Sequence, residues 1–421
     1  MTAWSCACRF AKAESLTAPI IILGAGQAGL QTAESLRSEG YVGAVTMIGD
    51  ERCPPYQRPP LSKAYLLGEF TEAQLTIRTP EALAKKEIEL RSGVAVTSID
   101  RNAKKLHLGN GDELDYASLC LATGSRPRPL PVAGAKLDGV FALRTLADTQ
   151  AIAAWLPFAK HVVVIGGGFI GLEFAAVAKK LGKAVVVLEA AERLMPRAVT
   201  PMMSEFFRDL HVAHGVEVEL GAAVSSLVGN AGKVTAVHTA DGREFPADLV
   251  LVGIGILPNA ELAQHAGLEC QHGIVVDACS RTADPHIVAA GDCTARRLAD
   301  GNLLRLESVQ NAIEQGKSAA AALLGKDRPF TANPWFWSDQ YDIKLQIVGL
   351  AAGCDRTVVR GDLAARKFSA FHYRGQRLIA VDSINSPEDH MPARKLLDLG
   401  LSPKPDDVAD LSRPVSALIT R

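Results

Sequence analysis

The sequence has no two cysteines in the Cys-x-x-Cys spacing, and its eight cysteines follow no zinc-like pattern. Scattered cysteines of this kind are typical of free thiols in a reducing compartment, so we expect a cytoplasmic chain without disulfides. Cys6 and Cys8 lie close together, but a pair of this kind is weak evidence for a metal. We therefore expect no metal site.

An excess of charge of one sign is also missing. The 45 lysines and arginines nearly balance the 46 aspartates and glutamates, which gives a formal net charge of −1 at pH 7. A balanced charge produces no general attraction to nucleic acid or to a membrane surface. A charged partner would have to meet a local patch, and we expect no nucleic-acid or membrane partner.

Long uninterrupted apolar runs are absent as well. The most membrane-like stretch, residues 162–178, contains four glycines and Glu173, and its pattern is that of a strand, a turn and a helix. The beginning of the chain lacks an apolar run of signal-peptide length. We expect residues 1–17 to form a disordered extension.

The sequence does contain two copies of one glycine-rich turn. At 421 residues the chain exceeds the roughly 250–300 residues at which single cores stop growing, so two or three domains are expected. Each turn, GAGQAG at 24–29 and GGGFIG at 166–171, follows a short apolar strand and begins a helical pattern. Such glycines let a pyrophosphate approach a helix N-terminus. Two dinucleotide sites suggest a bound flavin and an exchangeable nicotinamide.

Each copy is followed by a carboxylate at the end of its next strand. Asp50 and Glu51 follow the first copy and Glu189 follows the second. A carboxylate at this position hydrogen-bonds a ribose diol and repels a phosphate placed there. Glu189 therefore favours NADH over NADPH, although Arg193 lies near enough in the sequence to weaken that preference.

A single lysine in the stretch "PYQRPPLSKAYLLGE", residues 55–69, needs an explanation. Pro60 suits an early helical position, which would place Lys63 in a first helical turn. The helix dipole disfavours a cation there by a few tenths of a kcal/mol, as an order of magnitude. Either Lys63 is an ordinary surface lysine or a nearby group requires its charge.

Further motifs resemble those of a known family. "LCLATGSRPRPLP" at 119–131 and "TADPHIVAAGDC" at 282–293 resemble the ATG and GD motifs of two-dinucleotide-binding flavoproteins. More narrowly, "PPLSK", "LRTLADT", "GFIGLEFAA", "LRLESVQNAIEQGKSAA" and "PWFWSDQYDIKLQIVGL" resemble the oxygenase-coupled, NADH-dependent ferredoxin reductases. The likeness runs from about Pro19 to about His390.

The resemblance implies an α/β protein with two Rossmann-like dinucleotide-binding domains, glutathione-reductase-like, and a C-terminal α+β domain. We place the FAD-binding domain at 18–121 and 251–330, the NAD-binding domain at 122–250 and the C-terminal domain at 331–421. The implied enzyme passes electrons from NADH through FAD, one at a time, to a 2Fe–2S ferredoxin. That ferredoxin would supply a haem monooxygenase or a ring-hydroxylating dioxygenase.

The family's site residues map onto this sequence. Those implied for FAD are Gly24, Gly26, Ala28, Gly29, Asp50, Lys63, Val96, Ala122, Arg144, Asp292 and Val309. Those implied for NAD are Gly166, Gly168, Phe169, Ile170, Gly171, Glu189 and Gly255. Phe169 departs from the tyrosine that is frequent in the family, which keeps an aromatic ring at this position but removes its hydroxyl.

The same resemblance answers the question of Lys63, because in the family this lysine lies by the flavin and close to the glutamate of the GLE motif. We therefore predict a Lys63–Glu173 pair with a catalytic role. A cation placed in advance stabilises the negative charge that hydride transfer brings to the ring. The carboxylate keeps that cation from being buried without a partner.

An acidic ferredoxin would dock on a local basic patch, which governs association rate and orientation more than affinity. The candidate docking residues are Arg296, Arg297, Lys317, Trp335 and Trp337, with Arg305 and Lys344 as further cations. Large aromatic rings are common both in cores and at interfaces.

Other functions on the same scaffold stay open at this point. An NADH oxidase, or a reductase of rubredoxin or a quinone, would share the fold, as would a signalling flavoprotein that resembles apoptosis-inducing factor. Disulfide reduction is disfavoured, because Cys270 and Cys279 are nine positions apart and lie outside the first helix of the FAD unit.

Overall fold

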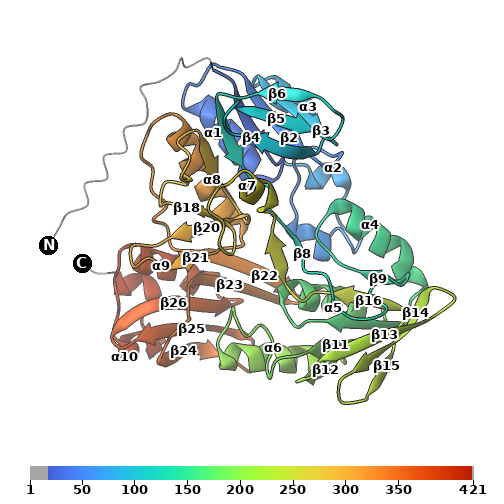
Figure 1. Cartoon of the computed structure of the whole chain (residues 1–421). Coiled ribbons are helices and arrows are strands. Elements are labelled where there is room, and N and C mark those ends of the chain that lie inside the picture. The colour runs from blue at the N-terminus through green and yellow to red at the C-terminus, as the bar shows by residue number, and fades with distance from the viewer. Residues whose placement is uncertain (1–17, 420–421) are drawn as a thin grey trace. The chain divides into compact units, whose positions relative to one another are not determined.

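The computed structural model describes residues 18–419, and the predicted extension at 1–17 lies outside the described residues. The described chain divides into two compact units. Unit 1 comprises residues 18–57, 76–126 and 258–332, and unit 2 comprises 58–75, 127–257 and 333–419. Figure 1 labels the helices and strands of both units.

The main sheet of unit 1 is parallel and has the strand order β19-β7-β1-β2-β3. Its strands are β1 (Ile20–Leu23), β2 (Val45–Gly49), β3 (Ile88–Ser92), β7 (Ser118–Leu121) and β19 (Ile287–Ala289). All four residues of β1 are buried, as expected for a strand covered on both faces. Helices α1 (Gln27–Ser38) and α8 (Val309–Leu323) pack against each other over this sheet.

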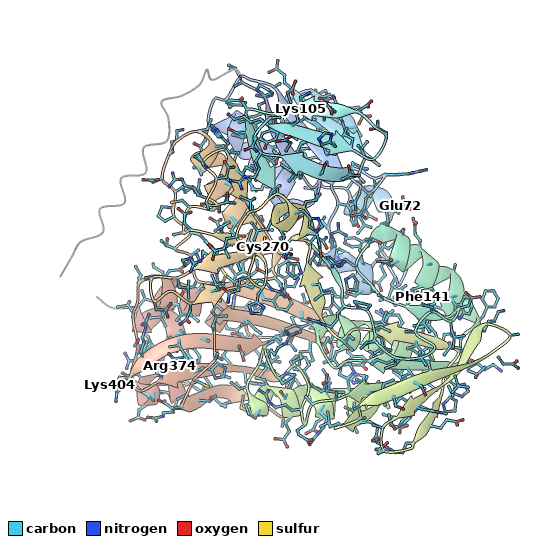
Figure 2. The ribbon with its side chains drawn as sticks, viewed as in Figure 1. Glu72, Lys105, Phe141, Cys270, Arg374 and Lys404 are labelled. Carbon is cyan, nitrogen blue, oxygen red and sulfur yellow. The ribbon has the colours of Figure 1, made fainter. Side chains whose placement is uncertain are left out.

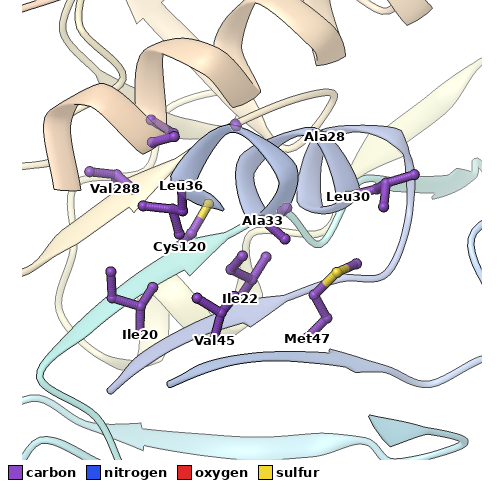
Figure 3. Close-up of a cluster of buried hydrophobic side chains, with 14 of the residues drawn as sticks. Ile20, Ile22, Ala28, Leu30, Ala33, Leu36, Val45, Met47, Cys120 and Val288 are labelled. Atoms are coloured by element: carbon purple, nitrogen blue, oxygen red, sulfur yellow. The ribbon is translucent and has the colours of Figure 1, made fainter. Parts of the chain in front are cut away.

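The core between this sheet and α1 is formed mainly by aliphatic side chains. Figure 3 shows Ile22 and Met47 of the sheet beneath Leu30 and Ala33 of α1. The remaining elements of unit 1 are two small sheets and two short helices. They are β4 (Val96–Asp100), β5 (Lys105–Leu108) and β6 (Glu113–Asp115), then β18 (Ile274–Val276), β20 (Thr294–Arg297) and β21 (Leu303–Leu304), with α3 (Pro80–Ala84) and α7 (Glu261–His265).

Unit 2 contains a second parallel sheet of the same kind, with the order β12-β11-β10-β16-β9. Its strands are β9 (Val140–Phe141), β10 (His161–Ile165), β11 (Ala184–Glu189), β12 (Glu217–Leu220) and β16 (Leu249–Val252). The helices of this part are η1 (Pro59–Ser62), α2 (Glu72–Leu75), α4 (Leu146–Trp155), η2 (Leu156–Phe158), α5 (Phe169–Lys180) and α6 (Pro201–Ala213). An antiparallel sheet adds β13 (Val224–Asn230), β14 (Lys233–Thr239) and β15 (Glu244–Pro246). The short strands β8 (Ser125–Pro127) and β17 (Ile256–Pro258) contain the positions at which the sequence passes from one unit to the other.

The C-terminal part of unit 2 is an antiparallel sheet in the order β22-β23-β26-β25-β24. Its strands are β22 (Trp335–Gln340), β23 (Ile343–Gly349), β24 (Arg356–Asp362), β25 (Lys367–Arg374) and β26 (Arg377–Ile384). Helix α9 (Pro387–Asp398) packs against β23 and β26, and the chain ends through α10 (Pro405–Ala409) and η3 (Val415–Leu418). The predicted fold class, two Rossmann-like sheets and a C-terminal α+β part, is therefore confirmed.

The C-terminal tail is packed, whereas the polar sequence beyond Pro403 suggests a loose one. Arg360 is only 7% exposed and donates to the carbonyls of Val408, Asp410 and Arg413. Its Nε lies 3.2 Å from an oxygen of Asp389. The three carbonyls belong to positions that are not regularly spaced, so no sequence pattern indicates them.

In the described residues, none of the helices combines the length and the apolar character that crossing a membrane would require.

Candidate functional site

The first glycine-rich turn, in unit 1, leaves no room for side chains. Gly24 has φ of +115°, and a Cβ on it would lie 2.0 Å from the carbonyl oxygen of Ala122. A Cβ on Gly29 would lie 1.9 Å from the oxygen of Gly24. Gly26 caps α1 without a side-chain hydrogen bond, and a Cβ there would meet nothing within 4 Å. The N-terminus of α1 therefore opens onto free space.

The GD motif lies at the same place in unit 1. A Cβ on Gly291 would lie 2.9 Å from the Cβ of Ala28, in the first turn of α1. The neighbouring Asp292 accepts a hydrogen bond of 3.1 Å from the hydroxyl of Ser125. Val309 begins α8, whose N-cap is Ser308. The glycine-rich turn, the segment with Ala122 and Ser125, and the GD motif thus come together from three separate parts of the sequence.

The other residues predicted for FAD are more dispersed. Asp50 is exposed directly after β2, and Val96 is a half-buried residue at the start of β4. Lys63 and Arg144 belong to unit 2, and the carbonyl of Arg144 accepts a hydrogen bond from Arg58.

The second glycine-rich turn, in unit 2, repeats the first. Cβ atoms on Gly166 and Gly171 would lie 2.5 Å from the oxygen of Gly253 and 2.3 Å from that of Gly166. Gly168 caps α5 without a side-chain hydrogen bond, and the nearest atom to a Cβ there would be 3.9 Å away. Phe169 and Ile170 form the first turn of α5. A second helix N-terminus is therefore open to an anion.

Glu189 ends β11 beside this turn. Its two oxygens accept hydrogen bonds from the backbone N–H of Gly167 at 2.7 Å and of Ala191 at 2.8 Å. The carboxylate is thereby fixed in orientation and keeps lone pairs for a ribose diol.

Arg193 does not weaken the preference that Glu189 predicts. Its guanidinium donates to the carbonyls of Val199 and Pro196 and to the hydroxyl of Ser204. These hydrogen bonds hold the guanidinium against residues 196–204, which follow it closely in the sequence. A 2′-phosphate would therefore meet the carboxylate without help from this arginine.

The predicted Lys63–Glu173 pair is present in unit 2. Lys63 Nζ lies 2.9 Å from Glu173 Oε1, and the two side chains are 16% and 5% exposed. Glu173 also accepts from the hydroxyls of Ser62 at 2.5 Å and Ser338 at 2.7 Å. A buried carboxylate with three donors is well compensated, whereas removal of any one donor would expose its desolvation cost.

The expected helical context of Lys63 is wrong. Residues 59–62 form one 3₁₀ turn, and Lys63 is its C-cap. Pro59, not Pro60, takes the first position of the turn. A lysine at the end of so short a turn meets no unfavourable helix dipole, so its placement is explained by Glu173 alone.

Aromatic residues of β22 lie near the start of α5 in unit 2. The ring of Phe169 lies 4.6 Å from that of Phe336, measured between centroids. Trp335 and Trp337, on alternate positions of β22, have centroids 5.4 Å apart, and the guanidinium of Arg394 lies 4.8 Å from the Trp335 ring. All three β22 aromatics are half-buried.

The cations predicted for docking in unit 1 are engaged with other groups. Arg296 is half-buried, stacks on Phe330 at 4.4 Å and donates to its carbonyl, and burial lowers its pKa. Arg297 pairs with Glu269 and Lys317 with Glu314. Arg305 likewise pairs with Glu307. Neighbouring carboxylates thus neutralise most of this charge.

Sequence reasoning missed several residues of the Glu173 network. Ser62 and Ser338 stand next to motif residues but have no recognisable role by spacing. Gln340 and His211 are also buried and joined by a hydrogen bond of 2.8 Å, although 129 positions separate them. No sequence pattern indicates this network, because the polar residues at 338–340 of β22 are consecutive and do not alternate with apolar ones.

Cysteine and metal chemistry find no support in the part of the chain that the structure describes. The described cysteines form no disulfide, and no group of His, Cys, Asp and Glu there could hold a metal. Burial raises the pKa of the thiols of Cys270, labelled in Figure 2, and Cys279. Neither is therefore a ready nucleophile.

The residues present fit two dinucleotides. Each glycine-rich turn ends at a helix N-terminus with a glycine cap, beside which a Cβ would meet no atom closer than 3.9 Å. Donors of this kind bind pyrophosphate. The GD-motif aspartate lies by one turn and a fixed glutamate by the other, which suits FAD in unit 1 and a nicotinamide dinucleotide in unit 2.

Comparison with known proteins agrees with this geometry. Residues 18–316 match the pyridine nucleotide-disulphide oxidoreductase family, and 335–419 match the family described as reductase C-terminal. The chain is 44% identical to rhodocoxin reductase of Rhodococcus erythropolis over 403 residues, covering 96% of this chain and 94% of that protein.

Two solved structures are similar over nearly their whole length. One is the ferredoxin reductase for the CYP199A2 system of Rhodopseudomonas palustris, with a TM-score of 0.93 and 45% identity over 96% of this chain and all of that one. The other is the covalent complex of putidaredoxin reductase with putidaredoxin, with a TM-score of 0.92 and 43% identity over 96% and 98% of the two chains. The chain therefore belongs to the pyridine nucleotide-disulphide oxidoreductase family and, within it, resembles the ferredoxin reductases.

Proposed function

We propose that this chain is an NADH-dependent flavoprotein that reduces a 2Fe–2S ferredoxin serving an oxygenase, in the cytoplasm. The observation that supports it most is the similarity along nearly the full chain to reductases of small redox proteins, combined with two intact glycine-rich turns. The chain keeps no cysteine pair in its described part that could take the place of such an acceptor.

FAD would be held by the first glycine-rich turn, Ala122, Asp292 and Val309 of unit 1, and the family likeness also predicts Lys63 and Arg144 for this cofactor. NADH would be held by the second turn, Gly255 and Glu189 of unit 2. FAD, when bound, supplies the conversion of a hydride into two single electrons. The predicted domain boundaries remain part of the proposal.

The protein's own contribution is position and charge. The backbone N–H groups at the starts of α1 and α5 bind the two pyrophosphates, and Glu189 selects the ribose without a 2′-phosphate. Lys63 offers a fixed positive charge, and Glu173 keeps that charge in place. Charge that is already oriented needs no reorganisation when the electrons arrive.

The ferredoxin would meet the Trp335–Trp337 side of β22. Among the candidate cations, Arg296, Arg297 and Lys317 are each engaged with nearby groups, so they offer little free charge. Arg394 has no ion-pair partner among the described residues and lies beside Trp335. Large rings with an adjacent cation suit recognition of an acidic protein surface.

Anaerobic reduction tests the proposal. The purified holoprotein is mixed with NADH or NADPH, and bleaching of the flavin band is followed. A 2Fe–2S ferredoxin is then added and its iron–sulfur band is recorded. Fast reduction by NADH followed by bleaching of the ferredoxin supports the proposal. Fast flavin reduction that leaves several ferredoxins oxidised contradicts it and favours an oxidase, a rubredoxin or quinone reductase, or a signalling flavoprotein.

A further inference from the structure

One face of β22 is a buried polar row. Phe336, Ser338 and Gln340 alternate with Trp335, Trp337 and Asp339 along the strand. Ser338 and Gln340 are each 1% exposed. Buried polar side chains are costly unless each has a hydrogen-bond partner, so Ser338 and Gln340 both need one.

Ser338 and Gln340 belong to a continuous hydrogen-bonded chain within unit 2. Ser338 Oγ lies 2.7 Å from Glu173 Oε1, and Gln340 Nε2 lies 3.2 Å from Ser338 Oγ. Gln340 Oε1 lies 2.8 Å from Nε2 of His211 in α6. The hydroxyl of Tyr341 lies 3.1 Å from His211 Nδ1. His211, Gln340 and Ser338 therefore connect Tyr341 with the Glu173 carboxylate, which pairs with Lys63.

The hydrogen bonds of this chain can point in only one direction while Glu173 is a carboxylate. Ser338 has a single hydroxyl proton, and a carboxylate 2.7 Å away only accepts. Ser338 must therefore donate to Glu173 and accept from the amide nitrogen of Gln340. The amide oxygen of Gln340 then accepts from His211, which places a proton on Nε2. Nδ1 is left to accept from Tyr341.

The reverse arrangement is internally consistent but excludes Glu173. If Tyr341 accepted from Nδ1–H, Nε2 would be an acceptor and the amide of Gln340 would turn over. Ser338 would then donate to the amide oxygen, and its lone pairs would face the carboxylate. The direction in which these hydrogen bonds point thus decides whether Ser338 donates to Glu173.

Backbone conformation, ring stacking and burial hold Tyr341 and His211 in this arrangement. Tyr341 has φ of +56° in the two-residue turn between β22 and β23, a conformation that such turns usually give to glycine or asparagine. Its ring stacks on His214, with centroids 3.7 Å apart and planes 11° from parallel. Burial lowers the pKa of His211 to about 4, so its ring is neutral near neutral pH and has one N–H to place.

We propose that Tyr341, His211 and Gln340 are positioning residues, which orient the Ser338 hydroxyl toward Glu173 and so set how strongly Glu173 holds Lys63. This rests on the proposed function, in which Lys63 lies by the flavin. Without the Ser338 donor, the carboxylate has Ser62 and Lys63 alone and draws the lysine charge to itself. Less of that charge is then available to the reduced cofactor.

The test compares two tyrosine variants of the full-length holoprotein. Tyr341→Phe removes the hydroxyl at the start of the hydrogen-bonded chain. Tyr373→Phe is the matched control, because Tyr373 is a buried tyrosine of the same unit whose hydroxyl donates to the Pro403 carbonyl outside the chain. The flavin midpoint potential and the rate of its reduction by NADH are measured for both. We expect Tyr341→Phe to make the potential more negative and to slow reduction about fivefold, the effect of one neutral hydrogen bond.

A double-mutant cycle shows whether the effect passes through Ser338. In a Ser338→Ala background, Tyr341→Phe should have no further effect on the potential. Gln340→Met, which interrupts the chain in the middle, should reproduce Tyr341→Phe and serves if that variant does not fold. Equal potentials for Tyr341→Phe and Tyr373→Phe, or full additivity with Ser338→Ala, overturn the proposal.

The histidine tautomer gives a readout that does not depend on turnover. Nitrogen NMR of histidine-labelled holoprotein, with the signal assigned through His211→Gln, should show His211 neutral and protonated at Nε2. Protonation at Nδ1 overturns the proposal. If the wild-type holoprotein has this tautomer but does not reduce a ferredoxin, the proposed function fails while the hydrogen-bonded chain stands.

Discussion

At the scale of single residues, the Glu173 carboxylate has three hydrogen-bond donors. They are two hydroxyls and an ammonium group, which come from two separate segments of unit 2. A pair this deeply buried contributes little net stability, because desolvation offsets most of the attraction. Its retention is more readily explained by the positive charge that it holds in place.

Replacement of Lys63 tests that role. Lys63→Met should slow reduction of the flavin by NADH at least about tenfold, because the fixed cation that would stabilise negative charge on the cofactor is lost. Lys63→Arg keeps the charge and should retain most of the rate. Stopped-flow reduction of the two variants gives the comparison. Equal rates for Lys63→Met and the wild type would make Lys63 a structural partner of Glu173 only.

Glu189 carries the predicted choice of nucleotide. Glu189→Gln keeps the side-chain size but replaces an acceptor by a donor and removes the charge that repels a 2′-phosphate. We expect kcat/KM for NADH to fall about tenfold and that for NADPH to fall less or to rise, so that their ratio narrows. Glu192→Gln, at an exposed position nearby, is the control. An unchanged ratio would remove Glu189 from the selection of NADH.

At the scale of elements, β22 presents two faces with different chemistry. Ser338 and Gln340 face the buried network, whereas Trp335 and Trp337 alternate with them, and Trp335 lies against Arg394. One strand therefore carries both the support of Glu173 and the proposed docking surface. Substitutions on its two faces should separate these effects.

Trp337→Ala should slow electron transfer to a ferredoxin more than transfer to ferricyanide. The reason is that a small anion needs no protein docking surface, whereas removal of a large ring at an interface costs about 2 kcal/mol or more. Phe158→Ala, at a ring that is 83% exposed in unit 2, is the control. Steady-state rates with both acceptors provide the measurement, and equal losses with the two would contradict a docking role.

The elements that the sequence predicts well are those encoded locally. The spacing of glycines within six residues requires the tight turns, and the strands before them are continuous apolar runs. The Lys63–Glu173 pair spans 110 positions, and only the likeness to a family indicated it. The link from Gln340 to His211 leaves no local signal at all. Nor does composition show that Arg297 and Lys317 are paired with carboxylates.

At the scale of the whole molecule, two buried histidines couple folding to pH. Burial lowers the pKa values of His211 and His390 to about 4, and neither ring nitrogen of His390 has a hydrogen-bond partner in the described part of the chain. The unfolded chain binds protons at these residues below about pH 6.5 while the folded chain does not. The stability is therefore fully present above about pH 6.5 and falls as the pH decreases toward about 4.

His390→Leu isolates one of these residues. The leucine fills a similar volume without polar atoms, so it should fold as well at neutral pH and should lose less stability on acidification. Between pH 7 and pH 5 we expect the free energy of unfolding to fall by about 2 kcal/mol less than in the wild type. Urea unfolding of the holoprotein at the two pH values provides the measurement, with His265→Leu, at an exposed position in α7 of unit 1, as the control. Parallel pH dependence in His390→Leu and the wild type would show that His390 takes up its proton in the folded state as readily as in the unfolded chain.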